Sequence, residues 1–303
     1  MSVSSSSSDF RRFDWHDAER QRPVLGSVWT PSSDPPDETA DPFPLVVFSH
    51  GAFGSALNYS WLAEYLTRNG FVVLGVDHFA ESWQYGADTV DPASPSRIWY
   101  RPADCTFALT RLLADEHFVG RIDPARIGAV GHSSGGTTAL ALGGAILDAD
   151  ALSAYCRSDA GQLDLGCHYA PRSSAVTPAP AEAARSYRDS RVGAIVALDP
   201  ACGPGYDEAS LSRVDIPALI VGSTDNDFLP FEYHAGRYAS LLPDAQLLKL
   251  QRGEGHFVYL DCCTSDRVAN GVPLCVDRPG VDREAVHADL APRILAFLMA
   301  SLA

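Results

Sequence analysis

Gly131-His132-Ser133-Ser134-Gly135 directly follows the apolar run Ile127-Gly128-Ala129-Val130, and a stretch rich in small residues, 137–147, comes after it. This order predicts a strand, a sharp turn and a helix, with Ser133 at the turn. In such an elbow the serine backbone is strained, and glycines flank it because a Cβ there would collide with a neighbouring strand or helix. The turn lifts the hydroxyl clear of the sheet, so Ser133 is our candidate nucleophile.

A second glycine-flanked turn, Ser49-His50-Gly51-Ala52-Phe53-Gly54, ends another apolar run. The backbone N–H of Ala52 is placed to point toward an oxyanion developing at Ser133, and we expect the second N–H from Ser134. Such donors stabilise charge that exists only in the transition state. The alternative, a phosphate-binding loop, lacks the P-loop lysine.

Apolar runs alternate along the chain with helical patterns. Most runs are continuously hydrophobic, which is typical of buried strands in a parallel sheet. We therefore expect an α/β fold with a mostly parallel, doubly wound sheet and flanking helices, whose strand C-termini present the reactive groups at one edge. Strands are expected at 24–29, 45–48, 71–76, 127–130, 193–198, 218–221 and 245–250, and helices at 57–69, 102–117, 137–147, 231–242 and 281–302.

The chain reads as one domain. Its 303 residues are 46% hydrophobic, enough for one large core, and no break in composition divides them. We expect a disordered serine-rich tail over residues 1–10 and a single domain over 11–303. The stretch 148–191 interrupts the strand–helix rhythm and is placed to cover the site as a cap or lid. A surface excursion with no role in substrate access is the alternative.

The net charge of −15 argues against nucleic-acid binding and against docking on anionic lipid. Residues 1–9 have neither a basic start nor an apolar core, and no run reaches membrane-spanning length. We expect a soluble, cytoplasmic protein without integral membrane association, and leave secretion open. The chemistry proposed for Ser133 requires no metal and no organic cofactor.

Seven cysteines occur without a repeated Cys-x-x-Cys, so neither a zinc site nor a redox centre of the thioredoxin type is indicated. Cys156 is spaced to pair with Cys167, and either Cys262 or Cys263 with Cys275. Free thiols are the alternative, because no secretory signal is visible.

His256 lies in Gly253-Glu254-Gly255-His256-Phe257, directly after the last strand-like run, and is our candidate general base. The sequence leaves two candidate positions for the catalytic acid, each at the end of a strand-like run. One run leads into Asp199-Pro200, and the next leads into Asp225 and Asp227; each of these carboxylates is placed to reach His256. A turn-forming or helix-capping aspartate is the structural alternative for each.

Seven segments spread over nearly the whole domain carry a family resemblance: 17–22 (DAERQR), 44–51, 76–78, 101–104 (RPAD), 131–136, 197–200 (ALDP) and 255–257. They resemble the α/β-hydrolases related to platelet-activating-factor acetylhydrolases and to bacterial proteins named predicted dienelactone hydrolases. The order serine, acid, histidine is also that of α/β-hydrolases. True dienelactone hydrolases use a cysteine nucleophile, whereas this elbow carries Ser133, so serine chemistry is implied.

The resemblance also bears on the acid. In the acetylhydrolases the acid lies in a Leu-Asp element after the earlier strand, which maps to Asp199, and chlorophyllases have an Asp-Pro at a similar place. The distance from Ser133 to Asp199 is much longer here, because of the insertion at 148–191. We place Asp199 first, with Asp225 and then Asp227 as alternatives.

We expect a serine carboxylic-ester hydrolase that forms an acyl-enzyme on a small-molecule ester with a short-to-medium acyl or aromatic group. The alternatives are an acyltransferase that uses the same triad and a non-catalytic ligand-binding protein on a hydrolase scaffold. An acceptor-dependent product would reveal the first, and ligand binding without reaction at Ser133 the second. Phe53, Trp83, Trp99 and Phe228 are candidate pocket residues.

Overall fold

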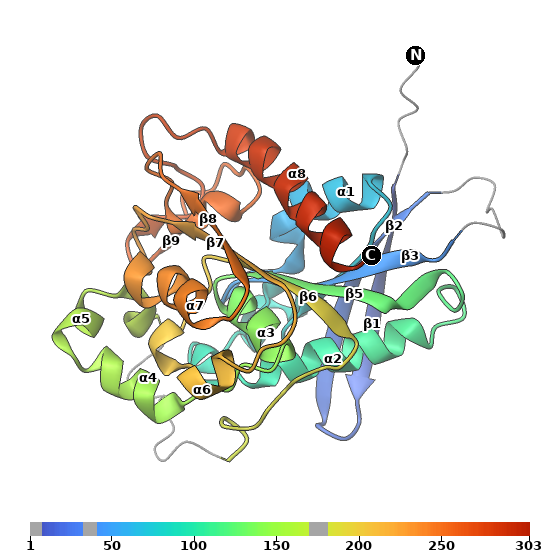
Figure 1. Ribbon diagram of the computed structural model, residues 1–303, viewed down its shortest axis with the longest axis horizontal. Coiled ribbons are helices and arrows are strands. Elements are labelled where there is room, and N and C mark those ends of the chain that lie inside the picture. The colour runs from blue at the N-terminus through green and yellow to red at the C-terminus, as the bar shows by residue number, and fades with distance from the viewer. Residues whose placement is uncertain (1–7, 33–40, 170–180) are drawn as a thin grey trace.

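One eight-stranded sheet runs through the protein (Figure 1). The computed structural model describes residues 8–32, 41–169 and 181–303. The strands of the sheet are β1 (Ser8–Asp17), β2 (Arg22–Pro31), β3 (Phe43–Ser49), β4 (Val72–Asp77), β5 (Ile122–His132), β6 (Val192–Leu198), β7 (Ala218–Ser223) and β8 (Ala245–Leu250). Their spatial order is β1-β2-β4-β3-β5-β6-β7-β8. Two further short strands, β9 (Val268–Ala269) and β10 (Val272–Pro273), pair with each other.

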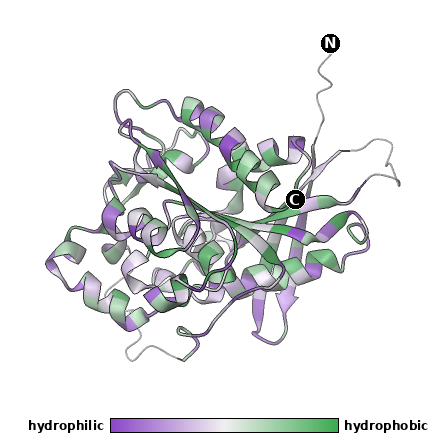
Figure 2. Cartoon of the chain, viewed as in Figure 1, coloured by the Kyte–Doolittle hydropathy of each residue, from purple (hydrophilic) through white to green (hydrophobic). Residues whose placement is uncertain are grey.

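The predicted mostly parallel sheet is confirmed. β4, β3, β5, β6, β7 and β8 pair in parallel, whereas β1 and β2 form an antiparallel edge. The apolar colour in Figure 2 runs along the central strands. These strands are buried on both faces, which explains their continuous hydrophobic runs.

Helices cover both faces of the sheet (Figure 1). Apolar residues of α1 and α8 pack with one face, and those of α2, α3 and α7 with the other. Side chains of β6 alternate between the two cores, as the pleat of a strand requires. The α-helices are α1 (Ser60–Arg68), α2 (Tyr100–Leu113), α3 (Ser134–Leu142), α4 (Ala149–Cys156), α5 (Asp159–Gln162), α6 (Glu208–Leu211), α7 (Ala235–Leu241) and α8 (Arg283–Ser301).

The predicted tail over residues 1–10 is wrong at its C-terminal end. Residues 1–7 lie outside the described residues, but β1 begins at Ser8 and pairs with β2 along its whole length. The ring of Phe10 packs against Trp29 with 5.1 Å between ring centroids. This cross-strand aromatic contact and the backbone ladder hold the segment in the sheet.

The described part of the 148–191 insertion contains α4, α5 and the short helix η5 (Leu165–His168), and residues 170–180 lie outside the described chain. The Cys156–Cys167 disulfide joins α4 to η5. The buried carboxylate of Asp164 pairs with His234 Nε2 at 2.7 Å, which ties the insertion to the turn before α7. Its role as a cap stays a prediction.

The ends of β3, β5 and β6 are aligned in the sheet. Ser49 pairs with Gly131, and His132 pairs with Leu198. The chain segments that follow these strands therefore leave the sheet at the same edge, next to one another. Over the part of the chain that the structure describes, no helix combines the length and apolar character needed to cross a membrane.

Candidate active site

Ser133 occupies the sharp turn between β5 and α3, with φ 56° and ψ −121°. This conformation is uncommon for a residue with a Cβ and stores strain at the turn. The glycines on both sides are required, because a Cβ on Gly131 would lie 2.2 Å from the oxygen of Gly135 and a Cβ on Gly135 1.9 Å from the oxygen of Ser49. The turn is also tied to the end of β6, since Ser133 N donates to Leu198 O at 2.9 Å.

His256 begins the short helix η9 (His256–Tyr259) after β8, and it is only 1% exposed. One face of its ring stacks on Phe228, at 5.2 Å between centroids, and the ring of His132 lies 4.6 Å away. Its backbone N–H donates to Asp227 Oδ1 at 2.9 Å, and its carbonyl pairs with His132 Nε2 at 2.9 Å. Backbone and ring are therefore both fixed.

Asp199 is the carboxylate that faces the imidazole. Its Oδ2 lies 3.8 Å from His256 Nδ1, and its Oδ1 accepts a hydrogen bond from Ser223 N at 2.8 Å. Oδ2 is buried and has no hydrogen-bond partner among the described residues. Asn226 Nδ2 also lies 3.5 Å from His256 Nδ1, but an amide nitrogen only donates. Of these two groups, only the Asp199 carboxylate can accept a hydrogen bond from Nδ1–H.

The two alternative acids lie elsewhere. Asp225 is exposed, and Arg278 Nη1 donates to its backbone oxygen at 2.6 Å. The Asp227 carboxylate accepts the backbone N–H of His256, so it holds the histidine loop instead of facing Nδ1. The assignment of Asp199 as the acid stays a prediction, which this geometry favours.

Burial sets the electrostatics of the pair. It raises the pKa of Asp199 to about 6, although the hydrogen bond from Ser223 N opposes this. Burial also lowers the pKa of His256 to about 3, opposed by the negative charge of Asp227. A neutral His256 is the form that can accept a proton from Ser133.

The predicted oxyanion donors adjoin the nucleophile. A Cβ on Gly51 would lie 3.4 Å from the Cβ of Ser133, so the turn that carries Ala52 packs directly against the serine. Ser134 is the first residue of α3, where backbone N–H groups have no intrahelical acceptor. A helix N-terminus also favours negative charge, as an oxyanion requires.

Two of the four predicted pocket residues lie at the site. Phe53 packs against Tyr169 at 5.2 Å between ring centroids, and Tyr169 packs edge-on against Phe228 at 5.3 Å. Because Phe228 in turn stacks on His256, these three rings form an aromatic row that ends at the candidate base. Tyr169 belongs to the insertion and has no recognisable motif.

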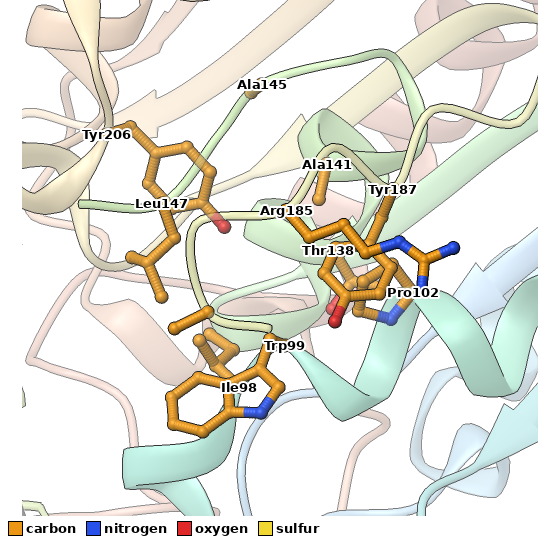
Figure 3. A pocket seen from close by; sticks show the side chains of 11 residues that line it. Ile98, Trp99, Pro102, Thr138, Ala141, Ala145, Leu147, Arg185, Tyr187 and Tyr206 are labelled. Carbon is orange, nitrogen blue, oxygen red and sulfur yellow. The ribbon is translucent and has the colours of Figure 1, made fainter. Parts of the chain in front are cut away.

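Trp99 lies apart from this row, because it is 5% exposed and belongs to the core that packs against α2 and α3, and its pocket role stays a prediction. Its indole lines a cavity of about 10 Å³ with Thr138 and Tyr206, shown in Figure 3. That is room for about one water molecule. Trp83 lies on the exposed helix η2 (Trp83–Tyr85) after β4, 40% exposed, and its pocket role stays a prediction.

A second Ser–His–Asp arrangement begins at Ser49, the first residue of the turn 49–54 that carries Ala52, which we call the oxyanion turn. Ser49 Oγ lies 2.8 Å from His78 Nε2, and His78 Nδ1 lies 3.0 Å from Asp104 Oδ2. All three residues are at most 2% exposed, and Asp104 also pairs with Arg20 and Arg22. Because the Ser49 side chain is buried, we interpret this arrangement as structural. Sequence reasoning missed it, although it joins the 17–22 and 101–104 segments.

The cysteines pair as Cys156–Cys167 and Cys263–Cys275, while Cys105, Cys202 and Cys262 are free. The second disulfide closes the segment that carries β9 and β10. Ala269 and Val272 of those strands pack in the apolar cluster around Phe228 and Phe257. The sequence left open whether Cys262 or Cys263 pairs with Cys275, and in the structure Cys263 is the partner.

Residues 9–106 match the model of the family "Platelet-activating factor acetylhydrolase, isoform II". The chain is 28% identical over 155 residues to the platelet-activating factor acetylhydrolase of Cavia porcellus, an alignment that covers 39% of this chain and 36% of that protein. The protein of the same name from Canis lupus familiaris is 28% identical over 159 residues, covering 38% and 35%. The match thus spans about a third of the length of these relatives.

A ferulic acid esterase from Streptomyces cinnamoneus has a similar structure, with a TM-score of 0.64 and 19% sequence identity. The superposition covers 99% of this chain and 91% of the esterase. The fold is therefore that of the α/β-hydrolases. The family match ends before Ser133 and His256.

Proposed function

We propose that this α/β-hydrolase, whose N-terminal third resembles the platelet-activating factor acetylhydrolases, is a serine carboxylic-ester hydrolase. The observation that carries the proposal is the strained Ser133 elbow, whose His132 lies 2.9 Å from the carbonyl oxygen of His256. Nδ1 of this buried histidine faces the otherwise unpartnered Oδ2 of Asp199. Each of the three elements, nucleophile, base and orienting acid, follows the end of a different strand at one edge of the sheet.

In the first step, Ser133 Oγ attacks the ester carbonyl while neutral His256 accepts its proton at Nε2. Asp199 keeps the productive tautomer by accepting Nδ1–H, and its negative charge stabilises the imidazolium. The N–H groups of Ala52 and Ser134 stabilise the oxyanion of the tetrahedral intermediate. His256 then returns the proton to the leaving alcohol, and the acyl-enzyme forms on Ser133.

In the second step, His256 activates a water molecule that attacks the acyl-enzyme. The same two N–H groups stabilise the second tetrahedral intermediate, and collapse releases the carboxylic acid and Ser133. Hydrolysis and acyl transfer differ only in which nucleophile attacks at this point, water or another acceptor.

The aromatic row of Phe53, Tyr169 and Phe228 offers an apolar surface next to His256, where an apolar acyl or alcohol group of the ester substrate can pack. Aromatic side chains of this kind favour flat or aliphatic groups of moderate size. We therefore place short-to-medium acyl esters and aromatic esters in the substrate class.

Two disulfides among the described residues support an oxidising compartment rather than the cytoplasm expected from the sequence. The substrate is a small molecule, and nothing in the proposed reaction needs a further partner.

The test is hydrolysis of p-nitrophenyl esters of increasing acyl length by wild type, Ser133→Ala and Ser94→Ala. Ser94 is a matched control, because its hydroxyl is buried, lacks a hydrogen-bond partner among the described residues and lies in the loop after β4. We expect activity in wild type and Ser94→Ala and none in Ser133→Ala. Full activity in Ser133→Ala would overturn the proposal, and turnover only with an added alcohol or amine would favour an acyltransferase.

A further inference from the structure

We propose that Arg101 and Tyr59 are positioning residues, which clamp the turn after β3 from two sides and thereby aim the backbone N–H of Ala52 at the oxyanion. This inference rests on the proposed ester hydrolysis. Neither side chain is assigned to touch substrate. They act through the two peptide groups that precede Ala52, and both are at most 1% exposed.

The peptide group between His50 and Gly51 is held at both ends. Arg101 Nη1 donates to the carbonyl oxygen of His50 at 2.7 Å. At the opposite edge of the same peptide group, Gly51 N donates to the hydroxyl oxygen of Tyr59 at 3.0 Å. Because a peptide group is planar, fixing its C=O and its N–H fixes the orientation of the whole unit.

The next peptide group carries the proposed donor. The carbonyl of Gly51 accepts from Gly54 N at 3.1 Å and pairs with His50 Nδ1 at 2.6 Å. In a trans peptide the N–H points opposite to the C=O, so these contacts turn the N–H of Ala52 away from the loop interior. Gly51 packs against Ser133, so that direction is set relative to the nucleophile.

Arg101 is itself rigidly placed. Its Nε and Nη2 donate to the two carboxylate oxygens of Glu81 at 2.9 and 2.7 Å, and its Nη1 also reaches Ser49 Oγ at 3.2 Å. A bidentate pair fixes the plane of the guanidinium. One turn later on α2, Asp104 holds His78, which contacts the same Ser49 hydroxyl. Helix α2 thus reaches Ser49 at the end of β3 directly through Arg101, and through His78 from Asp104.

Tyr59 continues the clamp toward the catalytic base. Its hydroxyl lies 2.8 Å from His132 Nδ1, and His132 Nε2 lies 2.9 Å from the carbonyl oxygen of His256. The carbonyl can only accept, so Nε2 carries the proton, Nδ1 accepts, and the Tyr59 hydroxyl donates to it. One chain of hydrogen bonds therefore joins the oxyanion turn, the nucleophile elbow and the loop of His256.

The expected signature is a loss of kcat with little change in KM. Removing one oxyanion donor outright costs about 10²–10³ in kcat. An N–H group that remains but is poorly aimed gives up only part of its stabilisation of the oxyanion. We therefore expect kcat to be about 10- to 100-fold lower in Tyr59→Phe and in Arg101→Lys. Lys keeps the charge beside Glu81, so no buried carboxylate is left alone, but it lacks the bidentate fork.

Matched controls come from the same chain. Arg191 is a half-buried arginine whose Nε and Nη2 donate to the two carboxylate oxygens of Asp189 at 2.8 and 2.6 Å and whose Nη2 also donates to Thr106 O at 3.2 Å, with no contact to the turn after β3. Tyr85 bridges two backbone groups, Leu25 N at 2.7 Å and Asp77 O at 2.8 Å. Arg191→Lys and Tyr85→Phe remove comparable contacts without touching the clamp.

The experiment compares these four variants with wild type for p-nitrophenyl ester kinetics, melting temperature and inhibition by a trifluoromethyl ketone, whose adduct carries an oxyanion. We expect lower kcat and weaker ketone inhibition by a similar factor in Tyr59→Phe and Arg101→Lys, with unchanged KM, and normal values in both controls. Each variant is assayed well below its melting temperature. Tyr59→Phe, which removes one oxygen only, keeps the test decisive if Arg101→Lys does not fold.

An unchanged kcat in folded Tyr59→Phe would overturn the clamp, as would an equal loss of kcat in the controls. Failure of the proposed function looks different, because wild type would then hydrolyse no ester or Ser133→Ala would stay active.

Discussion

Oδ2 of Asp199 lies 3.8 Å from Nδ1 of His256 and has no hydrogen-bond partner among the described residues. A buried carboxylate oxygen without a partner is costly, so its position needs a reason. An imidazole that becomes charged during the reaction supplies one. The separation exceeds a hydrogen bond, as is common in catalytic pairs before substrate binds.

Substitution of the candidate acids separates them. Asp199→Asn keeps the oxygen that accepts from Ser223 N but cannot stabilise the imidazolium, so we expect kcat to fall about 10³- to 10⁴-fold. Asp225→Asn should change kcat by less than about twofold, because Asp225 is exposed. The measurement is kcat for both variants with one p-nitrophenyl ester. The reverse ranking would assign the acid to Asp225.

The pH dependence of kcat/KM follows from the same pair. The reaction needs neutral His256 and ionised Asp199, and burial raises the pKa of Asp199 to about 6. Activity is therefore expected to be flat above neutral pH and to fall as pH drops through about 6, with an apparent pKa that belongs to the pair. Profiles from pH 4 to 9 test this. An acid limb near 6 that persists in Asp199→Asn would assign it to another group.

Protein stability should respond in the opposite sense. The pKa of Asp199 in the folded protein lies above its ordinary value of 3.8, so the ionised carboxylate destabilises the fold above about pH 6 and the penalty disappears below about pH 4. A shift of about two pKa units corresponds to about 3 kcal/mol. Asp199→Asn is thus expected to melt higher than wild type at pH 8 and to match it near pH 4. A lower melting temperature at pH 8 would contradict this.

The cysteines give a counting test. Cys262 is exposed, whereas Cys105 and Cys202 are at most partly accessible, and four further cysteines are paired. Alkylation without reductant should add one label to the native protein and three after unfolding, and reductant should raise the total to seven. Intact mass reports each number. Seven labels in unfolded protein without reductant would exclude both disulfides.

Much of the fold was predictable because buried parallel strands carry continuous apolar runs, and every predicted strand has a counterpart in the sheet. β1 was missed, since its sequence, SDFRRFDWHD, is dominated by charges and its strand character depends on pairing with β2. The helices of the insertion were missed for a related reason. They are short, and the Asp164–His234 pair and a disulfide hold them in place.

Local motifs were enough to single out Ser133 and His256, and their catalytic roles stay predictions. The sequence left Asp199 and Asp225 open, because packing decides which of these side chains points inward. The roles of Arg101 and Tyr59 were also hidden. Arg101 belongs to a segment that only the family resemblance singled out, and Tyr59 belongs to no motif. Arg101 lies 51 residues along the chain from its partner His50, and Tyr59 lies 8 residues from its partner Gly51.

The most direct test of the central claim is covalent labelling of the wild-type protein with a fluorophosphonate, followed by peptide mass spectrometry. We predict one adduct per chain, located on Ser133, with esterase activity lost in proportion to labelling and no adduct in Ser133→Ala. An active protein that stays unlabelled, or an adduct on a different serine such as Ser49, would contradict the account.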